Sequence, residues 1–187
     1  MKQPFYLLIL MALLFTACPD DEEPHNDQFL TDELDLEIVT GLNAYRIDGS
    51  PDGTYGNPNT FNDPVAVYPN PAISEVQIIY TADPALTITD VWMVAGTPFD
   101  EFGDVDYDQL LTDGLYTADE IAAQALELNI GMPNATQFNL SLNGIEAGYY
   151  RIFIRTSDER LYWENLYIDP DGDTPMSIWD AIASDWT

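Results

Sequence analysis

A group of aspartates near the end of the chain is the clearest candidate for metal chemistry. Its four carboxylates have the spacing of ligands: Asp169, Asp171, Asp173 and Asp180. Ca²⁺ prefers such groups of carboxylate oxygens. A helix-loop-helix calcium loop, however, needs Gly at its sixth position, where this chain has Thr174, and favours Glu at its twelfth, which here is an aspartate. The segment predicts either a calcium site or a solvated loop that caps a following helix, and no other cofactor is expected.

The side chains that most often act as catalytic bases and nucleophiles are scarce. His25 is the only histidine and Cys18 the only cysteine, and both precede the region expected to fold. This argues against a Ser-His-Asp triad and a zinc site. Pairs of carboxylates could still cleave glycosides, but with 33 acidic residues such pairs arise easily by chance. We expect a protein without enzymatic activity.

Aromatic residues are the third candidate for chemistry, because the chain has four tryptophans and eleven tyrosines. Such rings combine a large apolar face with a polar group and are suited to contact a glycan or a protein. They also fill the core of small β-sandwiches that lack disulfides. Both interpretations stay open at this point.

The charge of the chain excludes one class of partner. Four arginines and no lysine stand against 33 acidic residues after position 17, a formal balance of −29. Such a surface repels phosphate backbones, so nucleic-acid binding is not expected. The acidity is compatible with a saline habitat or with attraction of cations.

Residues 1–17 are typical of a secretory signal. Lys2 precedes thirteen apolar or small residues, fewer than the roughly 20 that a membrane-spanning helix needs. The segment Leu14-Phe15-Thr16-Ala17-Cys18 resembles a lipobox, which implies cleavage before Cys18 and acylation of its thiol. The alternative is an ordinary signal followed by an incidental free cysteine. We expect a lipid anchor at Cys18 that holds the protein at the outer membrane.

Residues 18–33 are expected to form an acidic tether. Positions 19–28 carry five carboxylates and no large apolar side chain, as in a solvated linker. An acidic run directly after the lipidated cysteine also resembles the surface-export signal of Bacteroidota lipoproteins. That resemblance implies exposure on the cell surface.

One β-rich domain is expected over residues 34–187. Alternating apolar and acidic residues predict a first strand within 34–47, and a stretch rich in Gly, Pro, Asn and Asp predicts loop over 48–64. Aromatic and β-branched residues predict six more strands, over 65–68, 76–80, 86–94, 138–142, 149–155 and 161–168. Their number and spacing favour an antiparallel β-sandwich.

Two helices are expected outside these strands. An insertion at about 96–136 contains the capping box Thr117-Ala118-Asp119-Glu120, which predicts a helix from that point. A short C-terminal helix is predicted from Thr174, with Pro175 in its first turn and apolar residues on one face.

Several motifs resemble the type IX secretion C-terminal sorting domain of Bacteroidota (type A, Por secretion tail). They include Pro69-Asn70-Pro71 before a strand and the Gly148-Tyr149 start of a later strand. The resemblance covers about residues 65–168 and implies an immunoglobulin-like sandwich. The chain departs from the family in its insertion of roughly 40 residues, about 19 residues after the last family strand, and the lipid anchor.

The sequence therefore favours a non-enzymatic lipoprotein on the surface of the outer membrane. Its immunoglobulin-like domain would act as a protein-interaction or assembly module. We expect a protein partner at the outer membrane, and type IX translocon components are one option for that partner. One alternative is a true sorting domain on a small cargo. Another is a glycan-binding accessory lipoprotein that uses aromatic faces of the insertion or of the last hairpin.

Overall fold

The computed structural model describes residues 34–99, 103, 105–128, 134–171 and 184. The chain divides into two units, Met1–Glu33 and Leu34–Thr187, and all described residues belong to the second. The predicted signal, Cys18, the tether and the C-terminal helix from Thr174 therefore lie outside the described residues. Among the helices that the structure describes, none has the length and apolar character needed to cross a membrane.

The fold is mainly β, as predicted. One sheet has the strand order β1 (Ile38–Val39), β6 (Ile88–Pro98), β8 (Gly148–Thr156) and β9 (Leu161–Ile168). The strands β6, β8 and β9 are antiparallel, whereas the short β1 runs parallel to β6. A second, antiparallel sheet has the order β4 (Val65–Tyr68), β5 (Glu75–Tyr80) and β7 (Gln137–Ser141).

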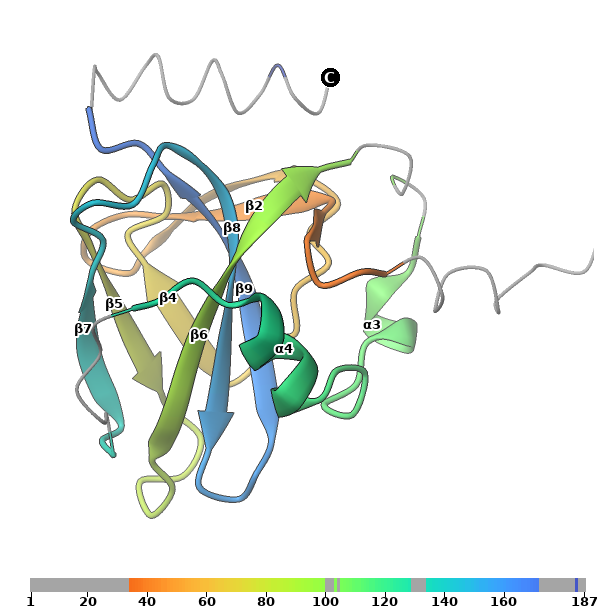
Figure 1. Cartoon of the computed structure of the whole chain (residues 1–187), viewed down its shortest axis with the longest axis vertical. Coiled ribbons are helices and arrows are strands. Elements are labelled where there is room, and N and C mark those ends of the chain that lie inside the picture. The colour runs from red at the N-terminus through yellow and green to blue at the C-terminus, as the bar shows by residue number, and fades with distance from the viewer. Residues whose placement is uncertain (1–33, 100–102, 104, 129–133, 172–183, 185–187) are drawn as a thin grey trace, which may run out of the picture. The chain divides into compact units, whose positions relative to one another are not determined.

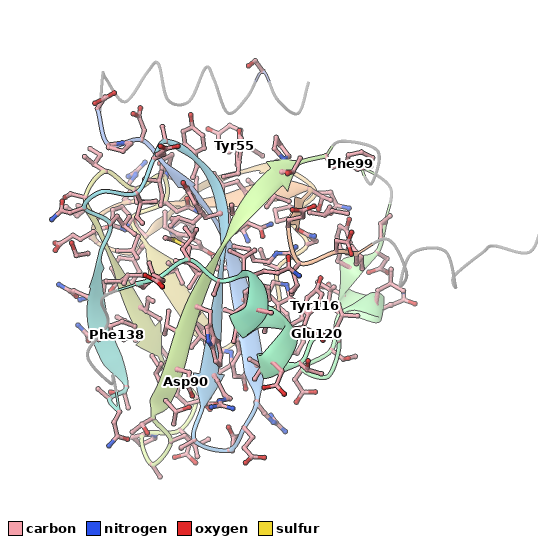
Figure 2. The ribbon with its side chains drawn as sticks, in the orientation of Figure 1. Tyr55, Asp90, Phe99, Tyr116, Glu120 and Phe138 are labelled. Atoms are coloured by element: carbon pink, nitrogen blue, oxygen red, sulfur yellow. The ribbon has the colours of Figure 1, made fainter. Side chains whose placement is uncertain are left out.

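The main hydrophobic core brings these two sheets together, as expected for a β-sandwich. Alternate apolar residues of β4 and β5, such as Val67 and Ile78, belong to the same buried cluster as Met93 of β6 and Ile152 of β8. In Figure 2, Phe138 marks β7 of one sheet and Asp90 marks β6 of the other. Strand periodicity thus places one apolar face of each sheet in the core.

The opposite face of β8 is also buried, which a two-layer sandwich does not require. Helices α3 (Tyr107–Leu110) and α4 (Ala118–Gln124) come from the insertion, and α4 lies against the β6–β8–β9 sheet (Figure 1). Tyr116, just before α4, packs edge-on against Phe153 and Trp163, with ring centroids 5.6 and 5.2 Å away. The insertion therefore shields part of this sheet from solvent.

The capping box that predicted α4 is present. The Glu120 N–H donates to the Thr117 hydroxyl at 3.3 Å, and the Thr117 N–H donates to the Glu120 carboxylate at 2.9 Å. Helix α3 was not predicted, because it spans four residues and its N-cap Asp106 makes no side-chain capping bond. Strand β6 continues to Pro98, so the insertion begins after that residue rather than at 96.

Two sequence predictions for the N-terminal part are wrong. The single strand expected over 34–47 is two strands, β1 and β2 (Gly41–Tyr45), which belong to different sheets. The stretch expected to be loop contains β3 (Pro51–Gly56), which pairs with β2 in an antiparallel hairpin. Strand β3 is mostly exposed and has no apolar alternation. Its extended form depends on backbone pairing with β2.

Gly41 allows a close approach of backbone at the start of β2. A Cβ atom at this position would lie 2.5 Å from the Pro58 nitrogen and 2.6 Å from the Tyr55 oxygen. Neither is a flexible side-chain end, so Gly41→Ala should lower the free energy of unfolding by about 1–3 kcal/mol, measured by urea denaturation. Gly53→Ala in β3 is the control, because its nearest neighbour would be 3.9 Å away. Equal effects of the two substitutions would contradict this explanation.

Candidate functional site

A pocket of about 290 Å³ lies where four connections of the fold meet. They are the segments after β3, after β5 and between α3 and α4, and the β8–β9 hairpin with the start of β9. The described lining residues are Phe61, Asp63, Pro64, Tyr80, Ala82, Asp113, Arg160 and Tyr162. The pocket thus combines a residue of the insertion with residues of the last hairpin.

Three aromatic rings form the apolar part of the pocket. The rings of Phe61 and Tyr162 are stacked, with centroids 5.8 Å apart and planes 9° apart. Tyr80 lies 6.2 Å from Tyr162 at 50°. Tyr80 and Tyr162 are buried, and burial raises the pKa of the Tyr80 phenol. These rings are part of the packed structure and form a fixed floor.

Charged side chains of both signs form the rim. The Arg160 guanidinium lies 3.6 Å from the Asp113 carboxylate and 3.8 Å from that of Asp158. The Thr156 hydroxyl donates to Asp158 at 2.5 Å, which lowers the pKa of that carboxyl. Asp63 is exposed and forms no ion pair with any residue that the structure describes. Donors and acceptors therefore stand side by side at the mouth.

Backbone hydrogen bonds hold the segments that carry these side chains. Phe61 and Trp163 exchange two of them, at 3.0 and 2.9 Å, so the segment after β3 is fastened to β9. The Thr81 N–H and hydroxyl both donate to the Pro64 carbonyl, at 3.1 and 3.0 Å. The Thr156 N–H donates to the Arg160 carbonyl at 3.0 Å. These hydrogen bonds therefore hold the loops that form the pocket in place.

A buried polar network next to β9 explains the Pro-Asn-Pro motif. The Asn70 side chain is fully buried, and its amide group donates to the carbonyls of Asn43 and Asn165, both at 2.8 Å. Its side-chain oxygen accepts from the Tyr167 N–H at 3.1 Å. Asn70 thereby joins β2 and β9. The peptide bonds before Pro69 and Pro71 are cis.

Arg151 occupies the centre of this network and is fully buried. Its guanidinium donates to the Asn165 side chain at 3.1 Å, to the Tyr116 hydroxyl at 3.0 Å and to the Asn59 carbonyl at 3.3 Å. Burial lowers the pKa of Arg151. The Tyr116 hydroxyl in turn donates to the Leu34 carbonyl at 3.0 Å. Arg151 therefore links β8 and the insertion to the first described residue of the domain.

Glu164 is a second buried charge-bearing group in this region. It accepts hydrogen bonds from the Asn62 side chain and, at 3.0 Å, from the Asn165 N–H. Burial raises the pKa of this carboxyl to about 7. Neither Glu164 nor Arg151 lines the pocket. Through Asn62, Glu164 holds the segment between β3 and β4 against β9, and through Asn59, Arg151 holds the same segment against β8.

The predicted calcium ligands are described only in part. The Asp171 N–H donates to the Asp169 carboxylate at 3.3 Å, as in a turn stabilised by an aspartate. Asp173 and Asp180 lie outside the described residues. Within the described part of the chain, no three His, Cys, Asp or Glu residues come together as a metal site would require.

The remaining motif residues, Gly148 and Tyr149, are the first two residues of β8. Gly148, at the start of β8, has a φ of 154°, a value that side chains disfavour. Tyr149 is buried, and its ring centroid is 4.8 Å from that of Tyr167. Both residues support the strand pairing of β8 with β9.

Sequence reasoning did not identify the pocket. Phe61, Asp113 and Arg160 are far apart in the chain, and no local spacing connects them. The abundance of aromatic residues was the one available signal, and it does not say which rings reach a surface. Comparison with protein-family models, curated proteins and solved structures gives no match.

Proposed function

We propose that this protein is a non-enzymatic lipoprotein of the outer-membrane surface whose β-sandwich domain is a protein-interaction or assembly module. The observation that carries this proposal is the early start of the packed domain. Leu34 and Leu36 are already buried, with exposed fractions of 4% and 5%. Only 16 positions separate Leu34 from Cys18.

This short separation limits how far the domain can reach from an anchor at Cys18. Sixteen residues span at most about 55 Å when fully extended. The average separation of a flexible chain of that length is roughly 20–24 Å. A domain held so close to a membrane is suited to contact other components of that surface.

The arrangement of the polar side chains supports binding rather than catalysis. The described lining of the pocket includes neither Cys, His, Ser nor Lys. The buried groups with shifted pKa values, Arg151 and Glu164, hydrogen-bond to neighbouring strands and loops instead. The strongly acidic surface would favour a partner with a basic face.

Replacement of the proposed anchor residue is the direct test. Cys18→Ser should remove the protein from the outer-membrane fraction of lysed cells, because no acyl chain can then be attached. Asp27→Asn in the tether keeps the cysteine and should remain with the membrane. Quantitative immunoblotting of the outer-membrane fraction measures the result. Retention of Cys18→Ser in the outer-membrane fraction would refute anchoring by lipid on this cysteine.

Deletion of the type IX translocon tests the rival function, which is a type IX sorting domain on a small cargo. The rival is based on the resemblance of Pro69-Asn70-Pro71 and Gly148-Tyr149 to motifs of that family. Loss of the type IX translocon should leave surface exposure unchanged if lipoprotein export delivers the protein. Disappearance from the surface in that strain would instead support the sorting function.

A further inference from the structure

The pocket defined above offers an apolar face and a hydrogen-bonding rim at the same place. The rings of Phe61, Tyr80 and Tyr162 supply the apolar face. Carboxylates are acceptors only and a guanidinium is a donor only, so Asp63, Asp113 and Arg160 supply both halves of a hydrogen bond. A ligand that matches this set must itself carry donors, acceptors and an apolar face.

The charge around the pocket narrows the class of ligand. The chain has a formal charge of −28, which repels anionic ligands. Arg160 lies 3.6 Å from Asp113 and 3.8 Å from Asp158, so it already neutralises part of the negative charge of the rim and lowers the attraction of the rim for a cation. A neutral molecule is not repelled by the overall charge, and several hydroxyl groups would let it bond to both the carboxylates and the guanidinium of the rim.

The size of the pocket narrows the class of ligand further. A volume of about 290 Å³ is at the lower end of the range for ligand pockets. It suits one ring of a sugar better than a folded peptide segment. Asp63, Ala82 and Arg160 are exposed, so the remainder of a longer chain could continue into solvent.

From these observations we infer that the pocket is a binding site for one neutral sugar ring of a glycan. The C–H face of the ring packs on the aromatic floor, and its hydroxyls bond to Asp63, Asp113 and Arg160. This inference adds a ligand to the proposed surface module and does not depend on how the module is anchored.

Titration of the purified full chain in detergent tests the site. The probes are the methyl glycosides of glucose, galactose, mannose, xylose and N-acetylglucosamine, followed by an array of neutral glycans. At least one probe should bind, and Arg160→Gln and Asp113→Asn should each weaken that binding about tenfold or more, because each removes a charge-assisted hydrogen bond. Both substitutions affect exposed side chains, so thermal unfolding should change little.

Asp108→Asn is the matched control, because Asp108 is exposed on α3 and does not line the pocket. It should bind the same probe as tightly as the unchanged protein. Absence of binding across both the glycosides and the array would overturn the inference. Sugar binding that is unaffected by Arg160→Gln and Asp113→Asn would also overturn it. Selective binding of arginine and lysine amides in place of the sugars would do the same. None of these outcomes bears on the membrane fractionation of Cys18→Ser.

Discussion

Replacing Asn70 by Asp is expected to lower the free energy of unfolding by about 3–4 kcal/mol, although the two side chains have nearly the same shape. In the native protein the Asn70 amide group donates to the carbonyls of Asn43 and Asn165. A carboxylate cannot donate to either carbonyl, and an ionised group would be buried there without a cation in contact. The substitution therefore removes hydrogen bonds that connect β2 and β9.

Urea denaturation followed by far-ultraviolet circular dichroism measures this loss. Asn139→Asp is the matched control, because Asn139 is exposed on β7 and its side-chain oxygen accepts a bond from Gln77 that an aspartate can also accept. The control should change stability by at most about 0.5 kcal/mol. An Asn70→Asp protein as stable as the control would show that the buried network contributes little.

The role of Asn70 shows how far the sequence motif could be interpreted. In the sequence, Pro69-Asn70-Pro71 is a motif that precedes a strand. The three hydrogen bonds of the Asn70 side chain involve residues 27, 95 and 97 positions away and could not be predicted from local spacing. The motif therefore located a structural feature without explaining it.

Elements with strong local signals were predicted closely. Strand β9 has the predicted bounds Leu161–Ile168, and β8 extends the predicted strand by one residue at each end. Their aromatic and β-branched residues are typical of strands wherever the partner lies. The α4 helix was predicted from its capping box, which depends only on residues within one turn.

Elements that depend on distant partners were missed. The β3 sequence Pro-Asp-Gly-Thr-Tyr-Gly is typical of a loop, and its strand form comes from pairing with β2. Charged residues in strands usually face solvent, yet Arg151 and Glu164 are fully buried because the N-terminal segment and the insertion cover the sheet. The pocket has the same origin, since it forms only when the four connections meet.

Glu164 is expected to make stability fall as the pH rises from about 4.5 to about 7. Burial raises the pKa of this carboxyl from 4.5 to about 7 in the folded protein. Between these two values the folded state keeps a proton that the unfolded state releases. The stabilising contribution of the protonated group is therefore fully present below about pH 4.5 and is lost as the pH rises through 7.

Comparison of the unchanged protein with Glu164→Gln isolates this contribution from the other acidic groups. The quantity to compare is the free energy of unfolding of the unchanged protein minus that of Glu164→Gln. This difference should decrease by on the order of 3 kcal/mol between pH 4.5 and pH 8. Urea denaturation at half-unit pH intervals measures it. Glu75→Gln, an exposed position on β5, is the control and should give a curve parallel to that of the unchanged protein over pH 6–8. A Glu164→Gln difference that stays constant or rises with pH would mean that Glu164 remains ionised in the folded protein, held by Asn62, Asn165 and the nearby charge of Arg151.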